Sequence, residues 1–197
     1  MDLDSSKTLF ALTAISITTG TLIYDLISIR SGKVRQHPYS WLIWGLITFV
    51  ILVAQISDEA GKGTWQMSAS FVSCLVRFIV SFFLAGERNI TKGDKICLFG
   101  CLLGMAGWAV TQSAAVAVII LTITDAYGFY PTVRKSWINP YSENVISYFL
   151  FGSVYFFGTL ALENYSITTA LFPITACLGT WAFCLFLIVR RRRLVMA

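Results

Sequence analysis

Long apolar segments alternate with short charged turns along this chain of 197 residues. Most of the segments have the roughly 17–25 residues that a helix needs to cross a bilayer. They do not alternate apolar and polar residues as the strands of a membrane barrel do, so the pattern predicts helices. The predicted membrane spans cover residues 8–29, 39–57, 65–86, 95–110, 112–131, 144–162 and 167–189.

The boundary between the fourth and fifth spans needs a separate argument. No charged residue occurs from Ile96 to Thr124, so this stretch is either one long helix or two helices joined by a tight turn. With seven spans, twelve of the 15 basic residues fall in alternate turns, which the positive-inside rule places in the cytoplasm. We therefore predict a hairpin near Gly107–Ser113, an outside N-terminus and a cytoplasmic C-terminus in the inner (cell) membrane.

The order of the segments occurs twice. Pro-Tyr-Ser stands between two apolar segments at Pro38 and again at Pro140, and Ser73-Cys74-Leu75 lines up with Ala176-Cys177-Leu178. We predict an all-α membrane protein whose seven transmembrane helices form a 3+1+3 parallel repeat of three-helix bundles. The parts are a first bundle in residues 1–90, a linker helix in 91–111 and a second bundle in 112–197. Repeats in membrane proteins usually frame a path between them.

The composition agrees with a membrane protein. Apolar residues make up 56% of the chain and charged residues 13%, about half the share in a soluble domain. Membrane lipid is therefore an expected partner, and the net charge of +5 comes from the turns, with no reason to expect nucleic acid. The five cysteines lie in apolar runs as packing residues. No motif for catalysis, a metal or a phosphate group occurs, so we expect neither an enzyme nor a cofactor.

Three charged residues lie inside predicted spans: Asp25, Arg77 and Asp125. A charge at membrane depth costs ~2.5–3.5 kcal/mol on insertion scales, so such residues usually face a cavity or a partner. The rise of a helix places all three roughly 8–14 Å from the cytoplasmic boundary, where they are able to meet in one layer. Thr21 and Ser28 share a helix face with Asp25, and a polar face in a span is typical of a water path.

Two interpretations of these charges stay open. In the functional one, Asp25 or Asp125 takes up and releases a proton during transport, and Arg77 is a counter-charge or the ligand of an anionic substrate. In the structural one, Asp25 and Arg77 form a static pair that holds two helices together. Either aspartate also lies near enough to the boundary to reach interfacial water.

Two further groups of residues are candidates for a transport path. The first group would line a pocket nearer the outside or the centre and contains Gln55, Thr180 and Trp181. The second group would form an inner gate. It contains Tyr130 and Pro131, since a proline at the end of a span loosens the backbone, together with Pro38 and Pro140 in the two Pro-Tyr-Ser turns.

One stretch of the chain resembles a known family. Tyr130–Ser136, continued by Pro140–Asn144, resembles the Pro-Gln turn of the SWEET, semiSWEET and PQ-loop transporter superfamily. The predicted 3+1+3 repeat resembles the architecture of that superfamily over nearly the whole chain. PnuC-type vitamin transporters are similar in architecture, and Trp41-x-x-Trp44 resembles their tryptophan-rich motifs.

The chain departs from the superfamily pattern in three places. Thr132 stands where the family has Gln, and Ile27–Arg30 lacks the matching proline. The predicted spans 65–86 and 167–189 lack the pocket asparagines that sugar-type members share, so a sugar substrate does not follow.

The resemblance implies a transporter that moves a small polar metabolite by alternating access between the two bundles, with proton coupling as an option. It also makes a homo-oligomer possible. The alternative is a non-transporting membrane protein, a receptor or an assembly subunit, built on the same scaffold. A water-accessible layer around Asp25 and Arg77 would favour transport, and a closed pair would favour the alternative.

Overall fold

The computed structural model describes residues 2–32, 37–84 and 90–195, and these ranges are helical apart from short turns. The elements are α1 (Leu3–Arg30), α2 (Pro38–Ser57), α3 (Gly63–Leu84), α4 (Lys92–Thr111), α5 (Ala114–Ile138), a short 3-10 turn (Pro140–Ser142), α6 (Val145–Leu160) and α7 (Ile167–Val195). Six of these helices are long and apolar enough to cross a membrane, and α6 is a shorter apolar helix of 16 residues. The prediction of an all-helical protein with membrane-compatible helices is confirmed.

The uncharged stretch after residue 96 forms two helices, with the break at Gln112 and Ser113, inside the predicted hairpin. Gln112 has a left-handed backbone (φ 54°) and ends α4. Its backbone N–H donates to the carbonyl of Trp108 at 2.8 Å, and its side-chain amide donates to the carbonyl of Ala109 at 2.6 Å. These bonds use carbonyls that a helix end leaves without partners, which stabilises the stop.

Three helix ends differ clearly from the prediction. α1 already begins at Leu3, α5 continues past residue 131 to Ile138, and α7 continues past residue 189 to Val195. The predicted ends follow the apolar length, which measures the part of a helix that lies in hydrocarbon. A helix continues beyond that boundary because its backbone bonds are made within the helix itself.

The helices form two groups with the same internal packing. Among the described residues, α3 packs against both α1 and α2, whose backbones do not come close to each other. In the same way α7 packs against both α5 and α6, whose backbones do not come close to each other and which touch through the rings of Phe129 and Tyr148. We call α1–α3 the first unit and α5–α7 the second unit. The units meet through α1 with α6, α2 with α5, α3 with α6 and α2 with α7, and α4 packs on α5 and α2.

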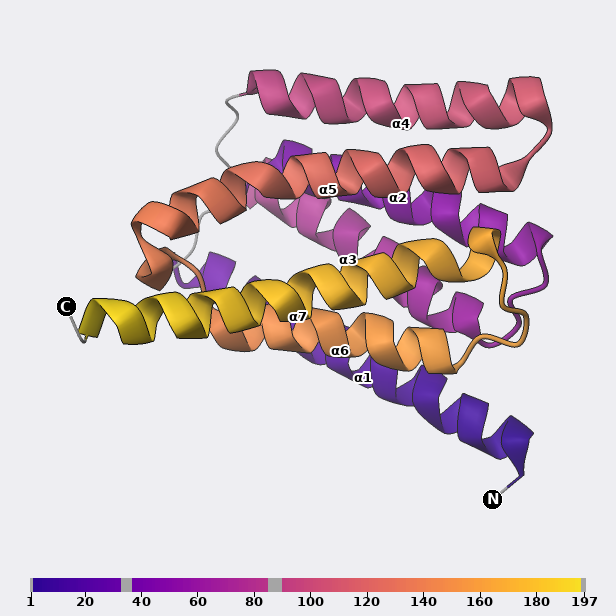
Figure 1. Cartoon of the computed structure of the whole chain (residues 1–197), viewed down its shortest axis with the longest axis horizontal. Helices are drawn as coiled ribbons and strands as arrows, with labels where there is room; N and C mark the ends of the chain where they lie inside the picture. Colours follow the sequence, from indigo (N-terminus) through magenta and orange to yellow (C-terminus); the bar gives the residue numbers. More distant parts are fainter. Residues whose placement is uncertain (1, 33–36, 85–89, 196–197) are drawn as a thin grey trace.

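The helices run back and forth along the bundle, so that successive turns lie at opposite ends (Figure 1). The residues in these turns give the two ends different charges. One end holds the start of α1 and the α2–α3, α4–α5 and α6–α7 turns, with Asp2, Asp4, Asp58, Glu59 and Glu163. We call it the acidic end. The opposite end, the basic end, holds the start of α4 and the end of α7, with Lys92, Lys95 and Arg190–Arg193. The chain termini lie at opposite ends.

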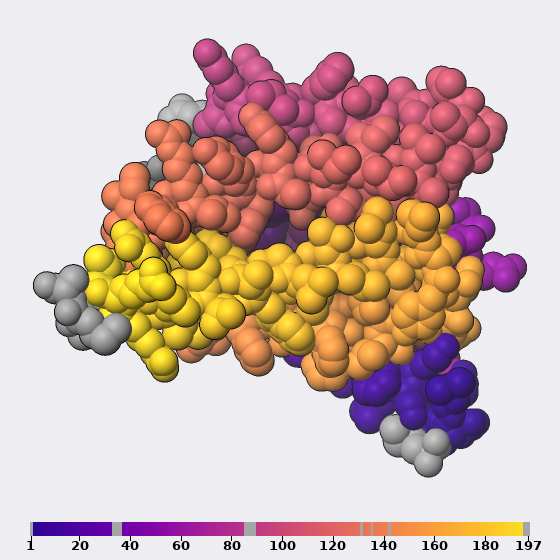
Figure 2. All heavy atoms as spheres, in the orientation of Figure 1, coloured from indigo at the N-terminus to yellow at the C-terminus, as the bar shows by residue number. Residues whose placement is uncertain are grey.

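The apolar core is centred on α2. Ile47, Val50 and Ile51 of that helix pack with buried side chains of α3, α4, α5 and α7. Figure 2 shows α4, α5, α6 and α7 on one face of the molecule, with a dip between α5 and α7 where atoms from earlier in the chain lie beneath. α2 is therefore the helix around which both units assemble.

Candidate functional site

Arg77 of α3 is the centre of a buried polar cluster in the first unit, and 3% of its side chain is exposed. Its Nε donates to the Asp25 carboxylate of α1 at 2.7 Å, and its Nη1 donates to the Ser73 hydroxyl. The guanidinium carbon lies 4.8 Å from the centre of the Trp41 ring of α2. Helices α1, α2 and α3 thus each contribute to holding one positive charge.

The polar face of α1 is turned toward this cluster. Thr18 and Ser28 are buried, and their hydroxyls donate to carbonyls one turn earlier in α1, at 2.9 and 2.8 Å. The Thr21 hydroxyl lies 3.4 Å from Nη2 of Arg77, a weak contact. An open groove of about 450 Å³ between α1 and α3 reaches Thr18 and Ser73. A water path along this face of α1 stays a prediction.

Asp25 and Arg77 meet, whereas Asp125 lies apart from them on α5. Neither ion pair among the described residues contains Asp125. Its carboxyl group lies near the Trp44 side chain of α2. The rings of Trp44 and Trp41 are 5.1 Å apart, edge to face. The three charges therefore belong to one chain of contacts, in which the two tryptophans separate Asp125 from Arg77.

Sequence reasoning did not identify Trp41, Trp44 and Ser73 as members of this site. The two tryptophans are three positions apart, a spacing that puts them on the same side of α2. Ser73 stands one turn before Arg77 on α3, a position from which a hydroxyl reaches a guanidinium on the same helix. Each of these residues lies three or four positions from a charged or aromatic residue in the same span. A search of the sequence for aromatic and polar residues at that spacing would therefore find them.

Gln55 lies nearer the acidic end and connects the two units. It is buried, and its side-chain amide donates to the carbonyl of Thr169 on α7 at 2.8 Å. Its Oε1 has no hydrogen-bond partner among the described residues. A buried amide oxygen without a partner is costly and is therefore uncommon in folded proteins. Gln55 therefore lies at the boundary between the two units.

Thr180 and Trp181 lie on α7 within the second unit, and their role in a pocket stays a prediction. The Thr180 hydroxyl donates to the carbonyl of Ala176 in its own helix at 2.7 Å. The indole of Trp181 donates to the carbonyl of Phe149 on α6 at 3.3 Å, and its ring stacks on the ring of Phe149. A Cβ added at Gly152 of α6 would lie 2.2 Å from Trp181. Both residues therefore pack against α6, within the second unit.

The predicted gate residues occupy helix starts and surfaces. Pro38 begins α2 and Pro140 begins the 3-10 turn, and both are buried. A proline is favoured at the first position of a helix, since its fixed φ suits the helix and its missing N–H has no partner there. Tyr130 is 62% exposed. Position 131 lies within α5, and the side chain of Pro131 is outside the described residues, so its role as a hinge stays a prediction.

Arginine side chains at the carboxyl end of α7 bind the second Pro-Tyr-Ser turn. Arg191 donates to the carbonyl of Pro140 from Nε and Nη2, at 3.0 and 2.9 Å, and its guanidinium lies over the Tyr141 ring. Arg190 stacks in a similar way on Trp137. Arginines that bind carbonyls and aromatic faces fix the geometry of a turn. The basic end of the second unit is thereby tied together.

The cluster is suited to holding and exchanging a charge. The Arg77 side chain is almost fully buried in this conformation, while the Asp25 side chain is 23% exposed. Protonation of Asp25, or arrival of another anionic or carbonyl group, would release Arg77 from its partner. Among the described residues no three His, Cys, Asp or Glu side chains come together in a way that would hold a metal ion. Comparison with protein-family models, with curated proteins and with solved structures finds no match to this chain.

Proposed function

We propose that the chain is a membrane transporter of the SWEET-like 3+1+3 type, in which α4 links two three-helix units. It would move a small polar metabolite by alternating access along a path between the first and the second unit. The observation that carries the proposal is that contacts inside and between the units come in matching pairs. Such a repeat, with ionisable residues at membrane depth, is the usual frame of a transport path.

The first support is the packing order. In each unit the third helix lies between the other two. The contacts between the units are also paired: α1 with α6 matches α5 with α2, and α3 with α6 matches α7 with α2. If the first unit is exchanged with the second, each contact between the units therefore falls on its counterpart. A two-fold axis along the bundle would produce the same pattern.

The second support comes from individual residues near the acidic end. The alignment of Cys74 with Cys177 is a shift of 103 positions, one more than the shift between Pro38 and Pro140. With this shift Gln55 corresponds to Gly158, and Gln66 corresponds to Thr169. Gln55 binds Thr169, and Gln66 lies against Gly158, where an added Cβ would be 2.5 Å from its Oε1. Each contact is thus the counterpart of the other.

The loop contact at the acidic end fits the same axis. The backbone N–H of Glu163 donates to the carbonyl of Ala60 at 3.0 Å, and these two residues also differ by 103 positions. A pair that is its own counterpart is expected where a two-fold axis passes. The Asp25–Arg77 pair would then act beside this axis as the polar group that meets the substrate, with Asp25 or Asp125 as the candidate for proton coupling.

The test is the accessibility of single cysteines to a membrane-impermeant thiol reagent. The five native cysteines are replaced first, and Thr21→Cys and Ser28→Cys are then compared with Ile23→Cys, which lies on the same helix and is 53% exposed on its outer side. Vesicles of both orientations are used, and His37→Cys in a turn reports access to the basic end. We expect positions 21 and 28 to react from the basic end and position 23 to stay unreactive in lipid.

The second candidate is a non-transporting membrane protein on the same scaffold. The observation that favours it is the closed Asp25–Arg77 pair, in which the arginine is almost fully buried. This candidate predicts that positions 21 and 28 do not react from either side while position 37 does. That result would overturn the transport proposal, and Asp25→Asn would then be expected to alter stability alone.

A further inference from the structure

At the acidic end the turn between α2 and α3 is hydrogen-bonded to the turn between α6 and α7. Besides the Glu163–Ala60 backbone bond, the Asn164 side-chain amide donates to the carbonyl of Asp58 at 2.8 Å. The Ser166 hydroxyl donates to the Asp58 carboxylate. Asp58 and Ala60 belong to the first unit, and the three others follow α6 in the second unit. The two units are therefore joined directly at this end.

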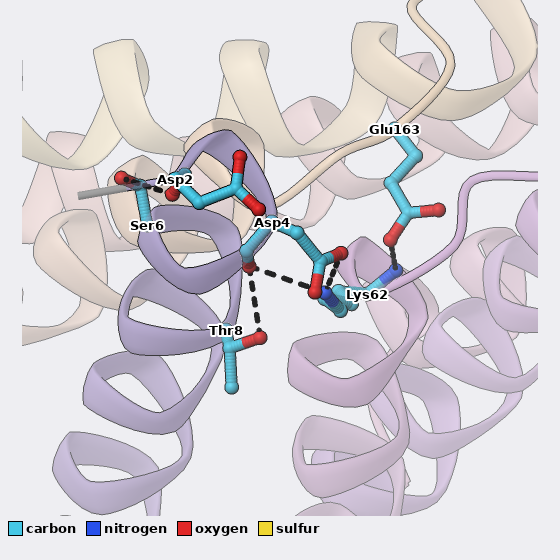
Figure 3. A network of polar contacts seen from close by, with 6 residues as sticks. All are labelled: Asp2, Asp4, Ser6, Thr8, Lys62 and Glu163. Atoms are coloured by element: carbon cyan, nitrogen blue, oxygen red, sulfur yellow. Dashed lines mark hydrogen bonds and ion pairs between the residues drawn. The ribbon is translucent and has the colours of Figure 1, made fainter.

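Glu163 extends this connection to the start of the chain (Figure 3). Its carboxylate accepts from the backbone N–H of Lys62 at 3.2 Å, and the Lys62 ammonium pairs with the Asp4 carboxylate on α1. Gly61 has a left-handed backbone (φ +58°), and a Cβ there would lie 2.2 Å from the Glu163 carboxylate. The carboxylate thus occupies the space that a side chain at position 61 would take. We call Asp58, Ala60, Lys62, Glu163, Asn164 and Ser166 the clasp.

The next layer below the clasp also closes the space between the units. Gly63 lies so close to the second unit that an added Cβ would be 2.4 Å from the Leu162 side chain and 3.1 Å from its backbone. Ala60 and Leu162 are fully buried in one small cluster. Below them, Gln55 binds Thr169 across the same boundary. A path between the units has no opening at this end unless these contacts separate.

The contacts of the clasp are of a kind that forms and breaks readily. Asp58 is half-buried, while Glu163 and Asn164 are exposed at the end of the bundle, where water competes for the same groups. Hydrogen bonds in such a place contribute little each, because breaking them exchanges protein partners for water. Segments of this kind open at a small free-energy cost compared with the apolar core around α2.

From this arrangement we infer that the clasp is the gate that shuts the transport path at the acidic end, and that its separation is the step that opens the path there. The inference rests on the proposed function, because a gate requires a path. Glu163 and Asp58 are its positioning residues: they bind across the boundary and touch no residue of the Asp25–Arg77 pair. Opening at the basic end would leave the clasp intact.

The test is the access of a thiol reagent to a position between the clasp and Arg77. Ser70 of α3 is 9% exposed and its hydroxyl accepts from the Gln66 side chain, so Ser70→Cys is a small change at the right depth. It is combined with Asp58→Ala and Glu163→Ala in the cysteine-free chain. We expect its labelling rate from the acidic end to rise roughly tenfold, because each lost bond contributes little but the effects of several bonds lost together on the opening equilibrium multiply.

The matched control is Glu59→Ala, which removes a negative charge from the same turn at an exposed residue. It should leave the labelling of position 70 unchanged from both sides. A general loosening of the fold would raise labelling at position 23 as well. The control therefore requires that position 23 stays unreactive in every variant. Equal labelling of position 70 with and without the clasp substitutions would overturn the inference.

A second variant locks the gate. Ala60→Cys with Glu163→Cys places two thiols on residues whose backbones already hydrogen-bond, and oxidation should bridge them. Site-resolved labelling should then show no reaction of position 70 from the acidic end, and reduction should restore it. Reaction of position 70 through the closed bridge would exclude the clasp as the gate.

The inference and the proposed function fail in different ways. If positions 21 and 28 react from the basic end while position 70 is unaffected by the clasp, the path stands and the gate lies elsewhere. If positions 21, 28 and 70 are all unreactive from both sides in every variant, the path itself is wrong, and the clasp is a structural contact.

Discussion

The two units carry different residues at one pair of corresponding positions on their third helices, Arg77 on α3 and Thr180 on α7. In the proposed repeat the shift of 103 positions relates them. Arg77 takes partners from all three helices of its unit. The Thr180 hydroxyl donates to a carbonyl of its own helix. The same packing order is therefore built once around a buried ion pair and once, among the described residues, without one.

The second unit uses aromatic contacts where the first unit uses an ion pair. Phe183 of α7 packs edge to face on Phe129 of α5 and on Tyr148 of α6, with ring centres 5.0 and 4.7 Å apart. Such contacts hold three helices together without an ion pair. Since this architecture packs without an ion pair, packing alone does not require Asp25 and Arg77, and their presence supports a function for the first unit.

The largest effect should follow from Arg77→Met, which keeps length and removes the charge. It leaves the Asp25 carboxylate in a span without its cation, and breaking one partner of a buried pair costs roughly 3–5 kcal/mol. We expect the free energy of unfolding in detergent micelles to fall by about this amount, measured by chemical denaturation. Thr180→Met at the corresponding position is the control and should cost far less.

The double variant Asp25→Asn with Arg77→Met sharpens the same comparison. It removes both charges together, so most of the lost stability should return. If Arg77→Met and Thr180→Met cost the same, the ion pair does not distinguish the units and the comparison is wrong.

A smaller effect is expected for Ser73→Ala. The second unit already has alanine at the corresponding position 176, where no arginine needs a hydroxyl. In the first unit the substitution removes a hydrogen bond to a charged group, which is worth roughly 1.5–3 kcal/mol. Unfolding in micelles should show this loss. Ser68→Ala is the control, because the Ser68 hydroxyl binds only a carbonyl of its own helix, and the two variants should not be equal.

The smallest effect is expected for Thr180→Val, which keeps the shape of the side chain. A hydroxyl that donates to a carbonyl one turn earlier adds little to a helix, since that carbonyl already accepts a backbone bond. The unfolding free energy should change by less than about 1 kcal/mol. A cost above that of Ser73→Ala would mean that Thr180 has a polar role in the second unit comparable to that of Arg77 in the first.

Part of the candidate site could be predicted from the sequence. A charge in an apolar span usually faces a partner or a cavity, so Asp25 and Arg77 stand out in predicted spans that are otherwise uncharged, and they meet in the structure. The separate place of Asp125 could not be predicted in the same way. Its distance from the other charges depends on Trp41 and Trp44, which fill the space between them, and no count of residues along one helix shows that.

The sequence by itself determined the helices and the two ends of the bundle. Apolar length selects helices in a bilayer, because every backbone group must be bonded within the helix, and the charged turns mark where each helix leaves the hydrocarbon. Tertiary structure alone decided the partners: Arg77 with Asp25, Gln55 with Thr169, and Trp181 with α6. These choices depend on the rotation and tilt of each helix, which are set by packing against its neighbours and not by its own residues.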